Sequence, residues 1–437
     1  MLSIEKRFAF STQFAKYLSM SVLGMIGAVG TILADTFFIS QQLGSIGLAA
    51  LNIALPIFGI INGLGLMIGI GGATAYSISR ARQQKEEANQ FYTTAIVFAG
   101  IIGMVLWLVG TLASKEVAYF FGADQVTIAM CHLYLKVILS FAPWFIFNHL
   151  WICFIRNDGN AHFPMLAMVI GNIANIILDY LFMYPFQWGI FGSALATGLA
   201  PMIGIMVSSL YIFGRNNHFH FSKLVPKFFF KIIELGLNSF INEFASSIVI
   251  MVFNILILKE AGNIGVAAYG VVANYALVVT SIFTGISQGA QPLLSQAHGQ
   301  KQHCYVKQLY RSTLVVGAVV GILIVSIVWL WTSPLVSVFN SSHDSQLQQL
   351  AIQGMKLYFL GFLISGYNII TPVFFSSTER AKFASLVSSF RGLIGIIIVA
   401  IVMAWIWQLT GIWLAFLVVE ILTALCITGI MYKYRYP

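Results

Sequence analysis

Twelve apolar runs, each long enough to cross a lipid bilayer, follow one another along this chain of 437 residues. A membrane-spanning helix needs about 20 such residues. Hydrophobic residues make up 59% of the chain and charged residues only 8%, whereas a soluble domain carries about 25% charged residues. We therefore predict an all-α polytopic membrane protein and not an enzyme, because the connections leave no room for a soluble catalytic domain. The predicted spans are residues 16–39, 47–78, 92–114, 128–154, 163–184, 190–214, 235–259, 265–297, 310–332, 347–376, 383–408 and 411–432.

The basic residues predict how these spans are oriented. Cytoplasmic segments of membrane proteins are enriched in Lys and Arg. With both termini in the cytoplasm, 18 of the 23 Lys and Arg residues fall in inside segments, four fall outside, and Arg391 lies within the eleventh span. This distribution predicts cytoplasmic termini and an even number of spans. It also accounts for the net charge of +9, so we expect the lipid bilayer, and no nucleic acid, as a partner.

The second half of the chain repeats the first. The sequence Leu-Gly-Ser-Ile-Gly-Leu-Ala-Ala at 43–50 matches Ala-Gly-Asn-Ile-Gly-Val-Ala-Ala at 261–268, an offset of half the chain length. Each half holds six spans, so both have the same orientation, as in transporters built from parallel repeats. We predict two six-helix lobes, 1–214 and 235–437, related by a pseudo-two-fold axis along the membrane normal and joined by a cytoplasmic linker at 215–234.

Four acidic residues lie well inside predicted spans: Asp35, Asp179, Glu243 and Glu420. A charged side chain at the centre of a membrane helix costs about 2.5–3.5 kcal/mol on insertion scales, so such residues usually face an interior cavity on an ion or substrate pathway. The alternative for a lone acid is a protonated carboxyl group that serves as a structural contact. Glu420 has no partner that the sequence identifies, and we interpret it as such a contact.

Asp179 has polar neighbours on its own helix. Asn172, Asn175 and Asp179 are spaced by three and four residues, so they share one helix face, and Thr197 lies in the next span. Together with Asp35 they form a set of hard oxygen atoms that suits Na⁺ or a proton relay. The sequence does not distinguish Na⁺ from H⁺.

The repeat provides an internal control for this cation-coupling site. The equivalent positions in the second half are apolar. A purely structural polar contact would be expected to persist in part after duplication, so the contrast favours a function confined to the first lobe. The second-half residues are Phe253, Ile396, Ala400 and Phe416.

Glu243 is a candidate for the substrate site. It lies about 12 Å into the seventh span at 1.5 Å per residue, with Asn238 and Asn242 on the same helix. These residues either line a substrate cavity or form a polar patch between helices, and the sequence leaves both possibilities open.

Several short motifs, in order from the first span to the last, resemble those of the multidrug and toxic compound extrusion (MATE) transporters, in particular a bacterial drug-exporter branch. They are Asp35-Thr36-Phe37-Phe38, Gly47-Leu48-Ala49-Ala50, Arg156-Asn157-Asp158-Gly159-Asn160, Gly192-Ser193-Ala194-Leu195-Ala196-Thr197, Val266-Ala267-Ala268-Tyr269-Gly270 and Gln288-Gly289-Ala290-Gln291-Pro292. The last motif adds Gln291 to the substrate-site candidates. The stretch Ser19-Met20-Ser21 lacks the proline that many members carry in the first helix.

The resemblance implies two lobes around a V-shaped cleft that opens to each side of the membrane in turn. It implies export of cationic amphipathic compounds in exchange for Na⁺ or H⁺, in the bacterial inner membrane. It assigns Asp35, Asn175, Asp179 and Thr197 to a cation site, with Na⁺ as the candidate metal. We expect a monomer that needs no other cofactor. A flippase for a lipid-linked precursor, or a metabolite exporter of the same architecture, remains the alternative.

Overall fold

The computed structural model describes residues 4–214, 217–340 and 344–434, and every regular element in these ranges is a helix. A 3-10 turn, η1 (Phe359–Gly361), precedes α10, and a π-helix, η2 (Phe390–Ile394), precedes α12. The α-helices are α1 (Ile4–Ala81), α2 (Lys85–Phe120), α3 (Ile128–Ser140), α4 (Ala142–Asn157), α5 (His162–Met183), α6 (Gly189–Ile212), α7 (Lys227–Gly299), α8 (His303–Phe339), α9 (Ser345–Tyr358), α10 (Phe362–Ser377), α11 (Ala381–Ser389) and α12 (Gly395–Lys433).

Several of these helices cross the membrane more than once. In the described ranges nine helical stretches are long and apolar enough to span a bilayer, and α3 with α4 forms a tenth span bent by 47°. Two of the nine, the 73 residues of α7 and the 53 residues from Ala381 to Lys433, are more than twice the length that one span needs. Each is interrupted by non-helical backbone, at Gly262 and at Trp407 and Gln408. Dividing them there gives the twelve predicted spans.

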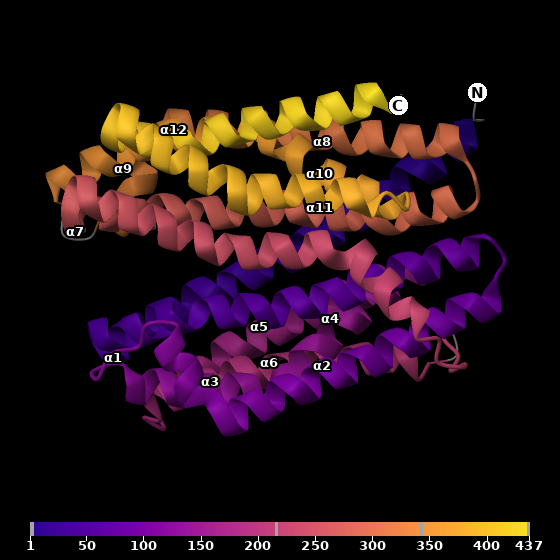
Figure 1. Ribbon diagram of the computed structural model, residues 1–437, viewed down its shortest axis with the longest axis horizontal. Helices are drawn as coiled ribbons and strands as arrows, with labels where there is room; N and C mark the ends of the chain where they lie inside the picture. The colour runs from indigo at the N-terminus through magenta and orange to yellow at the C-terminus, as the bar shows by residue number, and fades with distance from the viewer. Residues whose placement is uncertain (1–3, 215–216, 341–343, 435–437) are drawn as a thin grey trace.

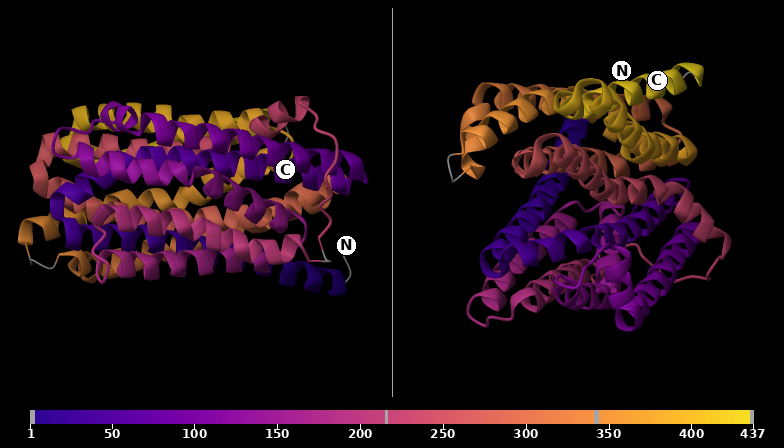
Figure 2. Two further views of the ribbon diagram at one scale, coloured as in Figure 1. Left: turned by 90° about the horizontal axis from the view of Figure 1, so that it is seen from below. Right: turned by 60° about the vertical axis from the view of Figure 1, so that its left-hand side comes forward.

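The two halves of the chain form two bundles of helices that lie side by side along the long axis of the molecule (Figure 1). The helices of each bundle run nearly parallel to that axis, as the left-hand view in Figure 2 shows. Helices α1 and α7 form the interface between the bundles: the second half of α1 packs on the first half of α7, and the first half of α1 packs on the second half of α7. This arrangement confirms the prediction of two six-helix lobes, which we call the N-lobe and the C-lobe.

The backbone follows the sequence repeat. Gly44 (φ 61°, ψ −150°) breaks α1, and Gly262 (φ 62°, ψ −160°), 218 residues later, breaks α7 in the same conformation. Ala113 in α2 and Trp331 in α8 interrupt their helices at the same offset. Four pairs of positive-φ residues occupy equivalent places in the two halves. They are Gly44 and Gly262, Gln83 and Lys301, Gly159 and Glu379, and Gln187 and Gln408.

The lobes approach each other most closely where glycines of α1 and α7 meet. A Cβ atom at Gly71 would lie 2.0 Å from the carbonyl oxygen of Ile232, and one at Gly236 would lie 1.9 Å from that of Met67. The equivalent contact places Gly289 of α7 against Tyr17 of α1. A side chain at these positions would collide with the backbone of the other helix. Only glycine therefore allows the two lobes to approach this closely.

Polar contacts cross between the lobes in the same region. The Asn157 side-chain amide donates to Gln291 (2.9 Å), whose own amide donates to Thr74 (2.8 Å), and Arg156 donates to Gln288 (3.1 Å). Each of these contacts joins an N-lobe helix to the second half of α7, so the lobes are sealed at this level.

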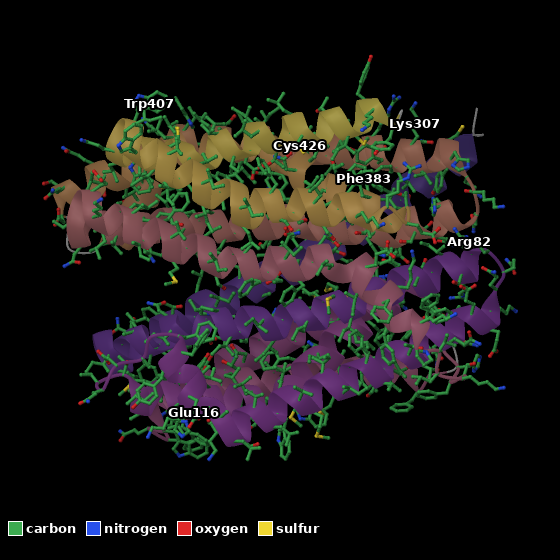
Figure 3. All side chains as sticks on the ribbon, viewed as in Figure 1. Arg82, Glu116, Lys307, Phe383, Trp407 and Cys426 are labelled. Carbon is green, nitrogen blue, oxygen red and sulfur yellow. The ribbon has the colours of Figure 1, made fainter. Side chains whose placement is uncertain are left out.

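At the end of the molecule beyond these contacts, Arg82 of the N-lobe forms an ion pair with Glu379 of the C-lobe. His298 also contacts Glu379 (3.2 Å) and, with Arg82, lowers the pKa of this carboxyl group to about 2, although partial burial opposes the shift. Figure 3 shows Arg82 and Lys307 projecting from the end at which both chain ends lie, whereas Glu116 and Trp407 lie toward the opposite end. Lys85, Lys301 and Arg380 lie in or next to the same helix connections as Arg82, Lys307 and Glu379, so basic residues gather at the closed end.

The linker prediction is wrong at its C-terminal boundary, because α7 already begins at Lys227. Pro226 precedes the helix, where its fixed φ favours helix initiation, and Phe228 stacks on Phe91 of α2 at 3.8 Å. Apolar packing thus extends the helix beyond the purely hydrophobic run. The remaining linker is held to the N-lobe by the backbone of His218, which donates to Asp158 (3.1 Å); residues 215–216 lie outside the described residues.

Candidate cation and substrate sites

The predicted cation-coupling residues meet inside the N-lobe. Asn175 is fully buried between Asp35 and Asp179, and its side-chain nitrogen lies 3.1 Å from Asp35 Oδ1 and 3.2 Å from Asp179 Oδ2 in the amide orientation that its surroundings satisfy. In this orientation the amide oxygen accepts from the Thr197 backbone N–H (3.1 Å), and the Thr197 hydroxyl donates to Asp35 Oδ2 (3.4 Å). Two carboxyl groups thus share a single amide nitrogen.

Helix periodicity explains how these side chains converge. Asn175 and Asp179 are four residues apart on α5, as are Ser193 and Thr197 on α6, so each pair occupies one helix face. Gly171 lets α5 approach α6 closely, because a Cβ atom there would lie 3.1 Å from the Ala200 carbonyl oxygen. Asp35 comes from the first half of α1, which completes the site from a third helix.

Some oxygen atoms of the site remain without a hydrogen bond. Asp179 Oδ1 and Ser193 Oγ are both buried and have no hydrogen-bond partner among the described residues. Buried polar atoms are normally satisfied, so each exception needs an explanation such as a bound ion or water. Together with Asp35 they offer the carboxylate and hydroxyl oxygens that Na⁺ or a proton requires, and the described residues contain no cluster of three or more His, Cys, Asp or Glu side chains for another metal.

One predicted residue, Asn172, is not hydrogen-bonded to the carboxyl pair, and one residue that was not predicted, Tyr134, lies beside the site. Asn172 has no hydrogen bond to the two aspartates; it packs against Gly27 of α1, and the Thr31 hydroxyl reaches its backbone carbonyl (3.5 Å). Sequence reasoning missed Tyr134 of α3, which is buried beside Thr197 and within electrostatic reach of both carboxyl groups. An aromatic residue in an apolar span gives no sequence signal that sets it apart from a packing residue.

The equivalent region of the C-lobe is filled with apolar side chains. Phe253, Ile396 and Ala400 are almost completely buried in one hydrophobic cluster. Tyr358 stacks on Phe416 with ring centroids 4.3 Å apart and meets Phe253 edge to face. The C-lobe position that corresponds to the carboxyl pair therefore has apolar side chains in place of the two carboxyl groups.

A second candidate site is a pocket of about 1210 Å³, including space open to solvent, in the C-lobe. Three predicted substrate residues line it: Asn238, Asn242 and Glu243. The Glu243 carboxylate has no hydrogen-bond or ion-pair partner within the described ranges, and its helix lies against Gly59 and Gly63 of α1. Gln291 instead lines a smaller adjoining pocket, where its side chain is engaged with Thr74 and Asn157.

Glu420 makes the polar contact that we expected, with partners that the sequence did not identify. Arg391 pairs with it, with Nη2 2.6 Å and Nε 2.8 Å from Glu420 Oε1, and the Asn368 side-chain nitrogen lies 2.5 Å from Oε2. Arg391 and Glu420 both line the C-lobe pocket. They are 29 residues apart, on either side of the break at Trp407 and Gln408, so their contact depends on how two spans face each other and not on spacing within one helix.

The MatE family model matches residues 15–181 and 239–406, one stretch in each lobe. The chain belongs to the MatE family. The multidrug export proteins MepA of Staphylococcus saprophyticus and Staphylococcus aureus are each 25% identical to it over 98% of this chain and 95% of the relative. The MatE matches confirm the family to which the sequence motifs pointed.

Solved structures of MATE transporters have the same fold. A multidrug resistance MATE family transporter of the MOP superfamily in an outward-facing conformation superposes with a TM-score of 0.90 at 20% identity, covering 96% of this chain and 95% of that one. A MOP superfamily transporter from Pyrococcus furiosus, whose binding pocket is described as having reverse polarity, gives 0.89 at 20% identity, with 97% and 95% covered. The twelve-helix, two-lobe architecture is therefore that of a MATE membrane transporter.

Proposed function

We propose that this MatE protein is a multidrug exporter that moves cationic amphipathic compounds out of the cell in exchange for Na⁺ or H⁺. The observation that carries the proposal is the carboxyl pair of Asp35 and Asp179. Both groups are buried in the N-lobe, share one amide nitrogen and have no ion-pair partner among the described residues. The names of the MepA relatives support the substrate class.

In this mechanism the cation and the substrate use different sites. The cation binds Asp35 and Asp179, and the positive group of the substrate binds Glu243 in the C-lobe pocket. The two sites are joined by α1, which carries Asp35 before its break at Gly44 and the glycines that contact the Glu243 helix after it. Ion binding in the N-lobe can therefore alter how the first two spans meet the substrate pocket.

The position of the closed end indicates which state of the transport cycle this conformation corresponds to in the proposed mechanism. The lobes are sealed by glycine contacts and side-chain hydrogen bonds at the end rich in Lys and Arg, which the positive-inside rule assigns to the cytoplasm. The proposed sequence begins in this outward-facing state in the inner membrane: a cation enters the N-lobe site and substrate leaves. The lobes then close outside and open inside, where the cation leaves and new substrate binds.

Coupling requires that the affinity for the cation differ between the substrate-bound and substrate-free forms. Moving one elementary charge through 100 mV is worth about 2.3 kcal/mol, so one or two cations support only modest substrate gradients. A flippase for a lipid-linked phosphate would instead need several cationic side chains in its cleft. Arg391 is the one basic residue lining this pocket, and Glu243 and Glu420 accompany it, which favours export of cations.

The test is substrate-driven ion flux in proteoliposomes, with Na⁺ and pH gradients imposed separately. Asp35→Asn and Asp179→Asn should each abolish gradient-driven efflux, because the neutral amide keeps the shape of the carboxyl group and loses its charge. Glu116→Gln is the matched control, since Glu116 is exposed on α2, a helix that contributes no residue to the site. Normal efflux by both aspartate variants, with protein present in the membrane, would refute the proposal. The gradient that drives efflux in the parent identifies the ion.

A further inference from the structure

The C-lobe pocket is lined by three acidic or basic side chains: Glu243, Arg391 and Glu420. Glu243 has no ionic partner among the described residues, whereas the other two pair with each other. Around them lie the apolar and aromatic residues that an amphipathic molecule needs, including Val249, Ile250, Tyr269, Tyr358 and Phe416. The pocket thus presents an acidic group and a basic group to the same ligand space.

Arg391 keeps donors that its pairing does not use. A guanidinium group has five N–H donors in a planar fork, and both measured contacts with Glu420, from Nε and Nη2, end on the same oxygen, Oε1. Nη1 has no hydrogen bond within residues 4–214, 217–340 and 344–434. The side chain is 15% exposed and lines the pocket.

The backbone holds Arg391 in an unusual position. It lies in the π-helix η2, which interrupts the eleventh span, and a Cβ atom at the adjacent Gly392 would lie 2.8 Å from the Ala245 Cβ of α7. Single π-helical turns are rare within α-helices and are frequent at functional sites. Here the turn brings Arg391 to the wall of the pocket.

We propose that Arg391 binds the acidic group of the substrate while Glu243 binds its ammonium group, so that the pocket selects zwitterionic amphipathic compounds. This inference rests on the proposed export function and narrows its substrates to compounds that carry an acidic group besides the positive one. Arginine suits this role, because its planar donors match the two oxygens of a carboxylate. Glu420, which itself accepts a hydrogen bond from the Asn368 side chain, holds the guanidinium in place when no substrate is bound.

The inference predicts a preference that two otherwise identical dyes can measure. A rhodamine with a free carboxylate and its methyl ester differ only in the acidic group, and their equilibrium binding to the detergent-solubilised protein is followed by fluorescence polarisation. Arg391→Lys keeps a positive charge near Glu420 but loses the planar fork. It should lower the affinity for the acid relative to the ester by about tenfold or more, since a hydrogen bond to a charged group contributes about 1.5–3 kcal/mol.

A double variant, Arg391→Met with Glu420→Met, removes both charges and should give the same loss of preference, which covers the case in which Arg391→Lys fails to fold. Glu116→Gln should leave the ratio unchanged. An unchanged ratio in the variants would overturn the inference. If the ratio were unchanged but Asp35→Asn still abolished efflux of both dyes, the proposed export function would stand and only the inference about zwitterionic substrates would fail. A parent protein that exports neither dye would contradict the export function itself.

Discussion

The two lobes differ most at the positions that the repeat makes equivalent. The N-lobe places Asp35, Asn175 and Thr197 in a buried polar cluster, whereas the C-lobe fills the same region with Phe253, Phe416 and their aromatic neighbours. The backbone breaks at Gly44 and Gly262 have nearly the same dihedral angles. One scaffold therefore holds two different interiors, which indicates that the polar cluster is not needed to form a lobe.

The lobes also neutralise their buried acids differently. Glu420 in the C-lobe has Arg391 as a counter-charge built into the chain. Asp35 and Asp179 have no basic residue in ion-pair contact within the described part of the chain. Because an uncompensated charge in the membrane interior is costly, this contrast supports the proposal that the N-lobe pair takes up a cation from solution, whereas Glu420 is already paired within the chain.

The largest expected effect is on stability in the C-lobe. Glu420→Ala leaves Arg391 as a largely buried, unpaired charge, and breaking such a pair costs about 3–5 kcal/mol. Asp179→Asn in the N-lobe creates no new unpaired charge and should cost much less. Thermal and chemical unfolding in detergent micelles measures both variants against the parent.

The control is the double variant Arg391→Met with Glu420→Met, which should be close to neutral because replacing a whole buried pair by apolar residues is often tolerated. Equal destabilisation by Glu420→Ala and Asp179→Asn would contradict the contrast between a compensated and an uncompensated acid.

A second prediction concerns the feature that the lobes share. Only glycine adopts φ near +61° and ψ near −150° without steric strain. Gly44→Ala and Gly262→Ala should therefore each lower the free energy of unfolding by about 1–3 kcal/mol. Nothing lies within 4 Å of a Cβ atom at either position, so the cost is backbone strain alone. The two variants should match within about 0.5 kcal/mol and add in the double variant.

Gly30→Ala and Gly270→Ala serve as matched controls. Both glycines are helical and have open space around them, so alanine should be neutral or stabilise the helix by about 0.5–1 kcal/mol. A large difference between Gly44→Ala and Gly262→Ala would show that the two breaks are not equivalent.

The sequence was sufficient to predict those features that depend on hydropathy and helical spacing. Twelve apolar runs gave twelve spans, and residues four apart on α5 do share a face, so Asn175 and Asp179 meet as expected. The helices extend beyond the apolar runs; α7 begins at Lys227 because Phe228 finds an aromatic partner in α2. Such a tertiary contact is invisible to hydropathy.

The contacts that the sequence did not predict depend on the rotation of one helix against another. Arg391 and Glu420 meet because a π-helix and a break lie between them, and neither feature has a sequence signal that spacing alone would detect. Tyr134 reaches Thr197 from α3 for the same kind of reason. Asn172, by contrast, has the expected spacing but packs against Gly27 one turn away from the carboxyl pair.

The smallest expected effect is at the closed end, where Arg82 of the N-lobe pairs with Glu379 of the C-lobe. Arg82→Gln should raise the fraction of molecules open at this end by at most about fivefold, because exposed ion pairs contribute about 0–1 kcal/mol. Spin labels on Gln84 and Lys382, which are exposed in opposite lobes, report the opening as a distance distribution.

The fraction of open molecules in the parent and in Arg82→Gln should differ in a pH-dependent way, because the ion pair depends on the charge of Glu379. The pKa of Glu379 is lowered from 4.5 to about 2, first by His298 and then by Arg82. A lowered pKa means that the ionised carboxylate favours the paired form. The contribution of the ion pair to the closed form is therefore fully present at pH values above the ordinary pKa of 4.5, and it is lost as the pH falls toward about 2. The parent and Arg82→Gln should differ above that range and converge below it. If they differed equally at the acidic limit, Arg82 would hold the lobes together through a contact other than Glu379, and the closed end would not depend on this ion pair.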